Sequence, residues 1–240
     1  MRILVTGGSS GLGEAIVKEF AKDKKNNIFF TYNLSKEKAQ ALCIKYPNTS
    51  KISCDFTNYN DVNYLVKKLE SLNIDTLINN YYSWPKKPLL PGTFLNKNFH
   101  KIDKNLFLDE FNDNVLPTIL ITQEAINLFR KNKNGRIITV LTSYLDSPSI
   151  GSSIYISNKN YLKGLCEVWA IENKNFNITS HYVCPSFMKT GHTSKMDKRM
   201  IEQYKGKSSP VELMSVKYVS KAISNFLKND KLKESIRIPL

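Results

Sequence analysis

The sequence predicts an α/β fold, with a doubly wound, mostly parallel sheet of about seven strands and helices on both faces. Short apolar segments rich in Val and Ile alternate along the chain with longer segments whose apolar residues recur at helical spacing. This alternation is typical of strands buried between two layers of helices. The absence of internal repeats and low-complexity tracts favours a single domain over residues 1–240.

The N-terminal half supplies the first strands in order. Residues 3–5 are short, apolar and β-branched, as expected of a buried strand, and residues 14–25 are amphipathic. Ser35 suits the start of a helix because its hydroxyl can cap free N–H groups. We expect further strands at 27–32, 51–54 and 75–80, and helices at 35–46 and 58–71.

The second half continues the pattern after an irregular stretch at 81–104, which three prolines and a glycine interrupt. A helical pattern over 105–131 contains Pro117, which lacks the N–H that a helix interior needs. We expect strands at 135–142, 178–183 and 235–238, and helices at 105–131, 154–173 and 216–228. Residues 185–214 are polar and basic and are expected to form a loop that covers a substrate.

Composition limits the classes of function. At 240 residues and 41% hydrophobic content the chain can bury one sizeable core, and no apolar run approaches the ~20 residues that span a bilayer. The N-terminus reads directly as a strand, without a signal peptide. Together with the unpaired spacing of the four cysteines, this predicts a cytoplasmic protein with reduced thiols and no membrane partner.

The net charge of +14 raises the alternative of a nucleic-acid-binding protein. The lysines are spread along the chain, however, and no run of five basic residues or aromatic-basic module occurs. We therefore predict no nucleic-acid partner. Steep salt dependence of binding to random DNA would support the alternative.

The first strand runs into a glycine-rich loop, Thr6 to Gly13, and then into a helix. Glycines allow a tight turn and close approach of a pyrophosphate, and the helix N-terminus offers N–H groups and a positive dipole end. This order indicates a Rossmann-type dinucleotide site. The expected contacts come from Gly7, Ser9, Ser10, Gly11, Leu12 and Gly13.

Tyr155 and Lys159 lie four residues apart on the helix predicted at 154–173, so they share a face. A cation beside a phenol is expected to lower the phenol's pKa from its usual ~10. Such a pair can exchange protons near neutral pH. Alone, the spacing also fits two polar residues on a solvated surface.

Taken together, these motifs resemble the classical short-chain dehydrogenase/reductase family over nearly the whole chain. The resemblance includes Asp55 after the third strand, Asn79-Asn80 after the fourth, and Pro185 with Thr190 nearby. It implies a catalytic tetrad in which Asn114, Tyr155 and Lys159 are three members. The hydroxyl member falls by spacing on Thr142, thirteen residues before the tyrosine, with Ser143 as the alternative.

The resemblance implies hydride transfer between a nicotinamide and a carbonyl or alcohol carbon. Tyr155 would protonate the substrate oxygen, Lys159 would hold the ribose and lower the tyrosine pKa, and Asn114 would hold a relaying water. The small-molecule substrate is expected to be a keto-sugar or a 3-oxoacyl thioester, and no metal is implied. The alternative function is an inactive NADP-binding sensor or scaffold.

Cofactor choice depends on residues 31–36, which contain no carboxylate for a ribose 2′-hydroxyl. NADP(H) is therefore favoured and NAD(H) is possible, with Tyr32, Asn33, Ser35 and Lys36 around the 2′-phosphate. The resemblance adds cofactor contacts from Asp55, Phe56, Asn80, Tyr81, Pro185 and Thr190.

One departure from the family pattern affects the substrate side. Tyr81-Tyr82 replaces the small residues, Ala and Gly, that the family places after Asn79-Asn80, and the direction of these rings cannot be read from sequence. The family also implies a homodimer or homotetramer built from the helices at 105–131 and 154–173.

Overall fold

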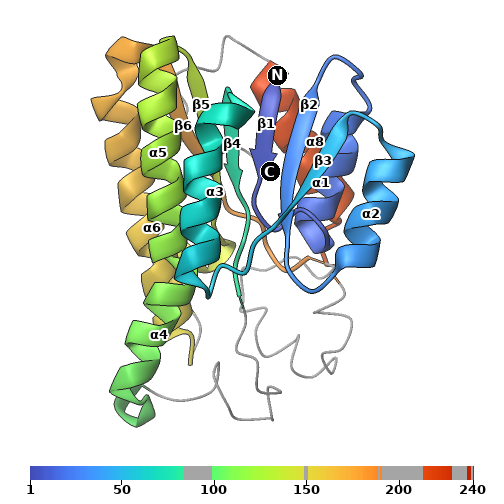
Figure 1. Ribbon diagram of the computed structural model, residues 1–240. Coiled ribbons are helices and arrows are strands. Elements are labelled where there is room, and N and C mark those ends of the chain that lie inside the picture. The colour runs from blue at the N-terminus through green and yellow to red at the C-terminus, as the bar shows by residue number, and fades with distance from the viewer. Residues whose placement is uncertain (84–98, 149–150, 189, 191–212, 229–236, 239) are drawn as a thin grey trace.

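The computed structural model describes residues 1–83, 99–148, 151–188, 190, 213–228, 237–238 and 240 (Figure 1). Within these residues, seven strands form one parallel sheet in the order β3-β2-β1-β4-β5-β6-β7, which confirms the predicted fold class. The strands are β1 (Arg2–Val5), β2 (Asn27–Tyr32), β3 (Thr49–Ser53), β4 (Thr76–Asn79), β5 (Gly135–Val140), β6 (Ile178–Val183) and β7 (Arg237–Ile238).

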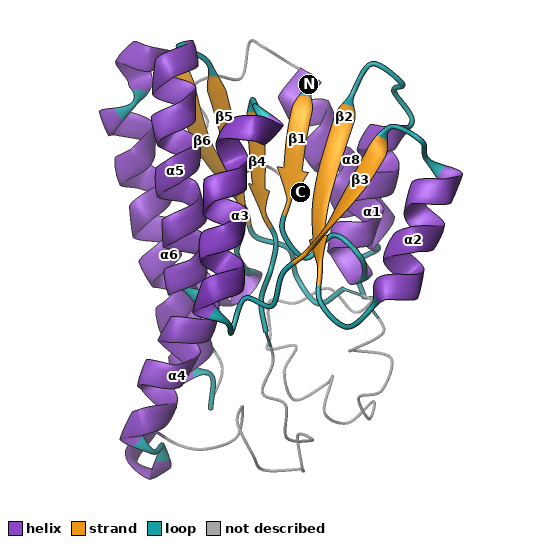
Figure 2. Ribbon diagram, viewed as in Figure 1, coloured by secondary structure: helices purple, strands orange, loops and turns teal. Residues whose placement is uncertain are grey.

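Helices cover both faces of the sheet (Figure 2). Their bounds are α1 (Gly11–Ala21), α2 (Lys36–Lys45), α3 (Tyr59–Leu72), α4 (Lys104–Asn114), α5 (Leu116–Asn132), α6 (Ser153–Glu172) and α8 (Val216–Lys228). Short 3-10 turns occur at Phe99–Lys101, Ser143–Leu145 and Lys174–Phe176. No described helix is long and apolar enough to cross a membrane.

The core divides into layers because successive side chains of a strand point to opposite faces. In β1, Ile3 and Val5 pack with α1, α2 and α8, whereas Leu4 faces α3 and α5. A third cluster joins α6 to the ends of β5 and β6. The side chains of Ile3, Leu4 and Val5 are all fully buried, as expected of a strand covered on both faces.

The prediction of one long helix over residues 105–131 was wrong, because the chain forms two helices there. α4 ends at Asn114, Val115 lies between the helices, and Pro117 occupies the first turn of α5. A proline in a first turn removes no helical hydrogen bond, since that N–H has no partner in the helix. The break ends α4 at Asn114 and leaves that residue beside the sheet edge.

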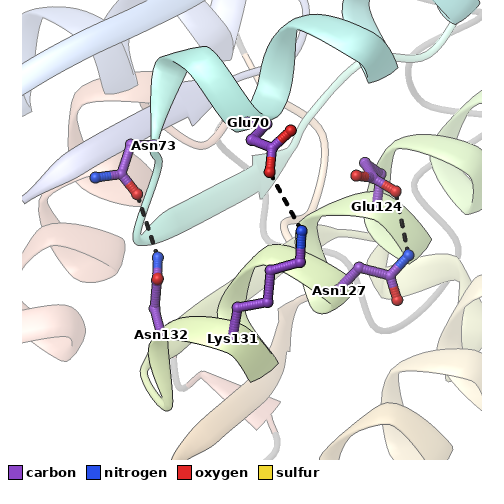
Figure 3. A network of polar contacts seen from close by, with 6 residues as sticks. All are labelled: Glu70, Asn73, Glu124, Asn127, Lys131 and Asn132. Atoms are coloured by element: carbon purple, nitrogen blue, oxygen red, sulfur yellow. Dashed lines mark hydrogen bonds and ion pairs between the residues drawn. The ribbon is translucent and has the colours of Figure 1, made fainter.

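On the outer surface, polar side chains link α3 to α5 (Figure 3). Lys131 contacts Glu70 at 3.2 Å, and Asn132 donates to the Asn73 side chain at 3.2 Å. Within α5, Asn127 donates to Glu124. These side chains are exposed, so the ion pair contributes at most about 1 kcal/mol, and the apolar contacts beneath hold the two helices together.

Candidate active site

The loop after β1 has the backbone geometry that its glycines were expected to permit. Gly7 and Gly11 have φ angles of 66° and 55°, which favour glycine. At Gly13 a Cβ atom would lie 2.1 Å from the Gly7 oxygen, so no larger residue fits without displacing backbone. The loop therefore packs directly against the first turn of α1.

The N-terminus of α1 faces the edge formed by the carboxyl ends of the strands. The Ser10 side chain makes no capping bond, and the first N–H groups of a helix have no partner within it. Thr190 lies against this loop, with its Cγ2 atom 3.8 Å from a Cβ built at Gly11. Free N–H donors and the positive end of an eleven-residue helix suit a pyrophosphate.

Two buried threonines hold the loop in place. Thr31 Oγ1 accepts the Gly7 N–H at 2.7 Å. Thr6 Oγ1 accepts the N–H groups of Asn80 and Tyr81 at 3.0 and 3.1 Å, and Asn80 Nδ2 donates back to the Thr6 main-chain oxygen. The glycine loop and the loop after β4 are thereby joined as one unit.

The residues expected at the 2′-phosphate gather at the end of β2. Ser9 and Ser35 hydroxyls lie 2.6 Å apart, linking this corner to the glycine loop. Lys36 begins α2, and Asn33 is exposed beside it. This corner carries hydroxyl, amide and ammonium groups and no carboxylate in residues 31–36.

Asp55, Phe56 and Tyr81 form the next part of the edge. The Asp55 carboxylate accepts the N–H and the hydroxyl of Thr57, which shapes the turn before α3. Phe56 and Tyr81 stack with ring centroids 4.0 Å apart and an angle of 17°. Of the two tyrosines after Asn80, Tyr81 thus packs on Phe56, in the loop after β3.

Tyr155, Thr142 and Lys159 come together at the ends of β5 and α6. The Thr142 hydroxyl hydrogen-bonds with Tyr155, whereas Ser143 uses its N–H to reach the main-chain oxygen of Pro185 at 3.0 Å. Lys159 Nζ is buried and donates to the main-chain oxygen of Val140 at 2.9 Å. The Thr142 hydroxyl, the candidate favoured by spacing, thus contacts the tyrosine directly.

The expected lowering of the tyrosine pKa was wrong for this arrangement. Burial raises the pKa of Tyr155 to about 12, and the Thr142 hydrogen bond only partly opposes that rise. Burial also lowers the pKa of Lys159 to about 8, because the ammonium loses its water. The lysine directs its charge to a backbone oxygen and lies 5.9 Å from the centre of the Tyr155 ring.

Tyr82 packs against both Tyr155 and Lys159. Its ring is edge-on to Tyr155 at 5.1 Å and 84°, and the Lys159 ammonium lies 4.7 Å from its centre. That distance is within the range of a cation–π contact. The second tyrosine after Asn80 therefore contacts both Tyr155 and Lys159, a placement that the sequence left open.

Asn114 ends α4 with its amide engaged on both sides. Its Oδ1 accepts the Ser83 N–H at 2.6 Å, and its Nδ2 donates to Glu110 Oε2 at 2.9 Å. Sequence reasoning missed Glu110, although an acid one helical turn before Asn114 was a usable signal. Burial, followed by the charge of Asp113, raises the Glu110 pKa to about 7.

Comparison with known proteins agrees with this geometry. The profile of the short chain dehydrogenase family matches residues 1–201. The chain belongs to the short-chain dehydrogenase family. It is 27% identical over 233 residues to a 3-oxoacyl-(acyl-carrier-protein) reductase of Buchnera aphidicola, covering 95% of this chain and 89% of the relative. It is 29% identical over 194 residues to the corresponding reductase of Rickettsia bellii, covering 81% and 75%.

Solved structures share the fold of this short-chain dehydrogenase. A Serratia marcescens short-chain dehydrogenase/reductase variant has a TM-score of 0.81 at 21% identity, covering 98% of this chain and 95% of the other. A 3-ketoacyl-(acyl-carrier-protein) reductase of Brucella melitensis, complexed with NADH, has a TM-score of 0.80 at 19% identity, covering 98% and 93%. The chain is thus an oxidoreductase of a family that acts on small molecules.

A nicotinamide dinucleotide fits the residues present. The positive φ angles of the loop and the N–H groups at the start of α1 together form a cradle for a pyrophosphate. Among the described residues, no three His, Cys, Asp or Glu side chains gather as a metal site.

Proposed function

We propose that the protein is an NADP(H)-dependent carbonyl reductase, which also catalyses the reverse oxidation of an alcohol. The carrying observation is that Tyr155 is hydrogen-bonded to Thr142 and adjacent to Lys159, on the sheet edge that carries the glycine loop. Ligands of open α/β sheets bind at this edge. When bound, the dinucleotide supplies the hydride.

The chain's own residues supply the proton and hold the substrate oxygen. Thr142 donates to that oxygen, and Tyr155 transfers its phenolic proton to it as the negative charge develops. Lys159, whose pKa near 8 lets it carry charge at neutral pH, stabilises the resulting phenolate. The raised pKa of Tyr155 keeps the phenol protonated before the reaction, as a proton donor requires.

The chemistry is tested by replacing Tyr155 with Phe. The ring and its packing remain while the proton is lost, so turnover should fall by orders of magnitude with cofactor binding nearly intact. Tyr161→Phe, on the exposed side of the same helix, is the matched control and should keep full activity. Undiminished turnover in Tyr155→Phe would rule out this mechanism, and NADPH binding without turnover of any carbonyl in the wild type would favour the sensor alternative.

Preference for NADP(H) is supported by the polar, carboxylate-free corner around Ser35 and Lys36. A 2′-phosphate would meet hydroxyls and an ammonium there. Fluorescence titration with NADPH and NADH tests the preference, and Lys36→Glu should weaken NADPH more than NADH. A tighter NADH complex in the wild type would overturn this part of the proposal.

For the substrate we propose a 3-oxoacyl thioester or a keto-sugar. The relatives in Buchnera and Rickettsia are 3-oxoacyl-(acyl-carrier-protein) reductases, which supports the thioester. The net charge of +14 suits an anionic carrier or a nucleotide-linked sugar. An NADPH-oxidation screen over ketones, acyl thioesters and keto-sugars decides between them.

We also propose that the chain is a single domain that works in the cytoplasm, and that residues 185–214 act as its substrate lid. The described ends of this segment are in contact. Met188 and Met214 form an isolated parallel β-bridge, and the Met214 N–H donates to the main-chain oxygen of Phe187 at 2.7 Å. The residues between these ends lie largely outside the described ones.

A homodimer or homotetramer built on α4, α5 and α6 is supported by exposed apolar side chains on α4 and α6. Leu108, Val168 and Ile171 are 64%, 45% and 76% exposed. Exposed apolar groups gathered on one side of a molecule mark interaction surfaces. Light scattering on Ile171→Lys should show a smaller assembly than the wild type, and an unchanged mass would remove Ile171 from the interface.

A further inference from the structure

Glu110 is a buried carboxyl group that the proposed chemistry does not use. It lies on α4 with 5% of its surface exposed. Its described side-chain contacts are polar, and its Oε2 atom accepts the Nδ2–H of Asn114 at 2.9 Å. A buried acid is costly unless hydrogen bonds satisfy it, so its retention beside the catalytic pair calls for a role.

The bond from Asn114 fixes which way the Asn114 amide points. Its other end, Oδ1, accepts the Ser83 N–H at 2.6 Å, and a main-chain N–H can only donate. If the amide turned over, two donors would face each other at Ser83. Glu110, as an acceptor, holds the orientation in which the Ser83 bond can form.

Ser83 in turn places Tyr82, the residue before it. The Tyr82 ring lies 4.7 Å from the Lys159 ammonium and edge-on to Tyr155 at 5.1 Å. The ring face attracts the ammonium, and the contact gains strength because the site is desolvated. Glu110 is therefore connected to Lys159 through Asn114, Ser83 and Tyr82, and each step is a direct contact or a peptide bond.

A second link runs through α6. Asn158, which precedes Lys159 in the chain, donates from its buried Nδ2 to the main-chain oxygen of Glu110 at 3.3 Å. Glu110 thus joins α4, the loop after β4 and α6. These are the three elements that carry Asn114, Tyr82 and Lys159.

The charges around Glu110 make this joint sensitive to pH. Burial raises the pKa of Glu110, and so do the charges of Asp113 and Asp109 on the same helix. Hydrogen bonding to Asn114 and Tyr82 lowers the pKa and partly offsets this rise. From α6, the Asn158 amide contacts the main chain of Glu110, and Lys159 is the next residue of that helix. From α5, the Thr118 hydroxyl donates to the main-chain oxygen of Asn114. Loss of the Glu110 proton adds a buried charge beside the acids of its own helix.

We propose that Glu110 is a positioning residue for the catalytic pair: it fixes the Asn114 amide and, through Ser83, holds the Tyr82 ring against Lys159. The rate effect of this device rests on the proposed function, whereas the placement of the ring does not. Glu110→Gln keeps an acceptor for Asn114 without the charge. Glu110→Leu removes the acceptor at similar size.

The placement is tested by NMR on protein with 13C-labelled lysine, with Lys159→Arg used to assign the signal. An aromatic face shifts nearby protons upfield, so the ε-methylene of Lys159 should resonate upfield of the other lysines in the wild type and in Glu110→Gln. The shift should be lost in Tyr82→Leu, which removes the ring itself, and in Glu110→Leu. An unchanged upfield signal in Glu110→Leu, or its absence in the wild type, overturns the proposal.

The rate effect is tested with NADPH and a ketone that the wild type reduces. Glu110→Leu should lower kcat on the order of 10²-fold with little change in KM, as expected of a misplaced catalytic group. In the wild type, a plot of kcat against pH should show an inflection near pH 7, where Glu110 titrates. Glu110→Gln should keep the wild-type rate at pH 6 and lack this inflection. An inflection that persists in Glu110→Gln refutes the pH sensitivity. If the wild type reduces no carbonyl, the proposed function fails while the NMR experiment still decides the placement.

Discussion

Replacing Glu110 by Gln should stabilise the protein above neutral pH and leave its stability nearly unchanged in acid. Burial and the nearby Asp113 raise the Glu110 pKa from 4.5 to about 7, so the folded state holds a proton that the unfolded state releases. The stability from this group is fully present below pH 4.5 and is lost as the pH rises through 7. Gln does not titrate and avoids this loss.

The magnitude follows from the two pKa values. Each pKa unit corresponds to about 1.4 kcal/mol, so a rise from 4.5 to about 7 corresponds to ~3 kcal/mol at most. The free energy of unfolding of Glu110→Gln, relative to the wild type, should rise by up to ~1.4 kcal/mol per pH unit between these values. Above pH 7 the difference should level off.

Urea unfolding at half-unit steps from pH 4.5 to 8.5 measures this difference, since the other carboxyl groups titrate in both proteins. Glu70→Gln is the matched control, because Glu70 is exposed on α3 and pairs only with Lys131 among the described residues. Its difference from the wild type should stay within about 1 kcal/mol at every pH. A flat difference for Glu110→Gln would show that folding leaves the Glu110 pKa unshifted, and one that falls with pH would show that the folded state stabilises the carboxylate. Either result would refute the reasoning.

The glycine loop gives two further predictions. Gly13→Ala should abolish NADPH binding and lower Tm, because the added Cβ would lie 2.1 Å from the Gly7 oxygen. Gly164→Ala should raise Tm, because the added atom has nothing within 4 Å and a glycine inside a helix costs about 1 kcal/mol. Equal melting temperatures for the two variants would contradict this. Thr6→Val leaves two main-chain N–H groups without their acceptor and should cost about 1–3 kcal/mol for each, while Thr6→Ser should recover most of the loss in thermal unfolding.

Hydrophobic periodicity predicted the parts of the fold that depend on local sequence. The ranges 27–32, 178–183 and 216–228 match the bounds of β2, β6 and α8, because apolar patterning and flanking turn residues delimit them. The expectation of one helix over 105–131 was wrong because the apolar pattern continues across Val115, although Pro117 was a signal in the sequence that a second helix begins there.

The candidate site divides in the same way. Spacing favoured Thr142 over Ser143 as the hydroxyl of the tetrad. Thr142 is hydrogen-bonded to Tyr155, and its catalytic role stays a prediction. The pKa of Tyr155 could not be predicted, because it depends on burial and on where the Lys159 ammonium points. Glu110 and Tyr82 could not be placed either, since their contacts cross three elements that are distant in the sequence.

The position of β1 in the middle of the sheet constrains how the chain can fold. β1 is the first of the seven strands along the sequence, yet one of its two neighbours is β4, whose residues Thr76–Asn79 follow some seventy positions later. At the far edge, Tyr182 of β6 pairs with Arg237. Since loop closure must precede such pairings, folding of the sheet should be slow and should finish only once Arg237 and Ile238 have been synthesised.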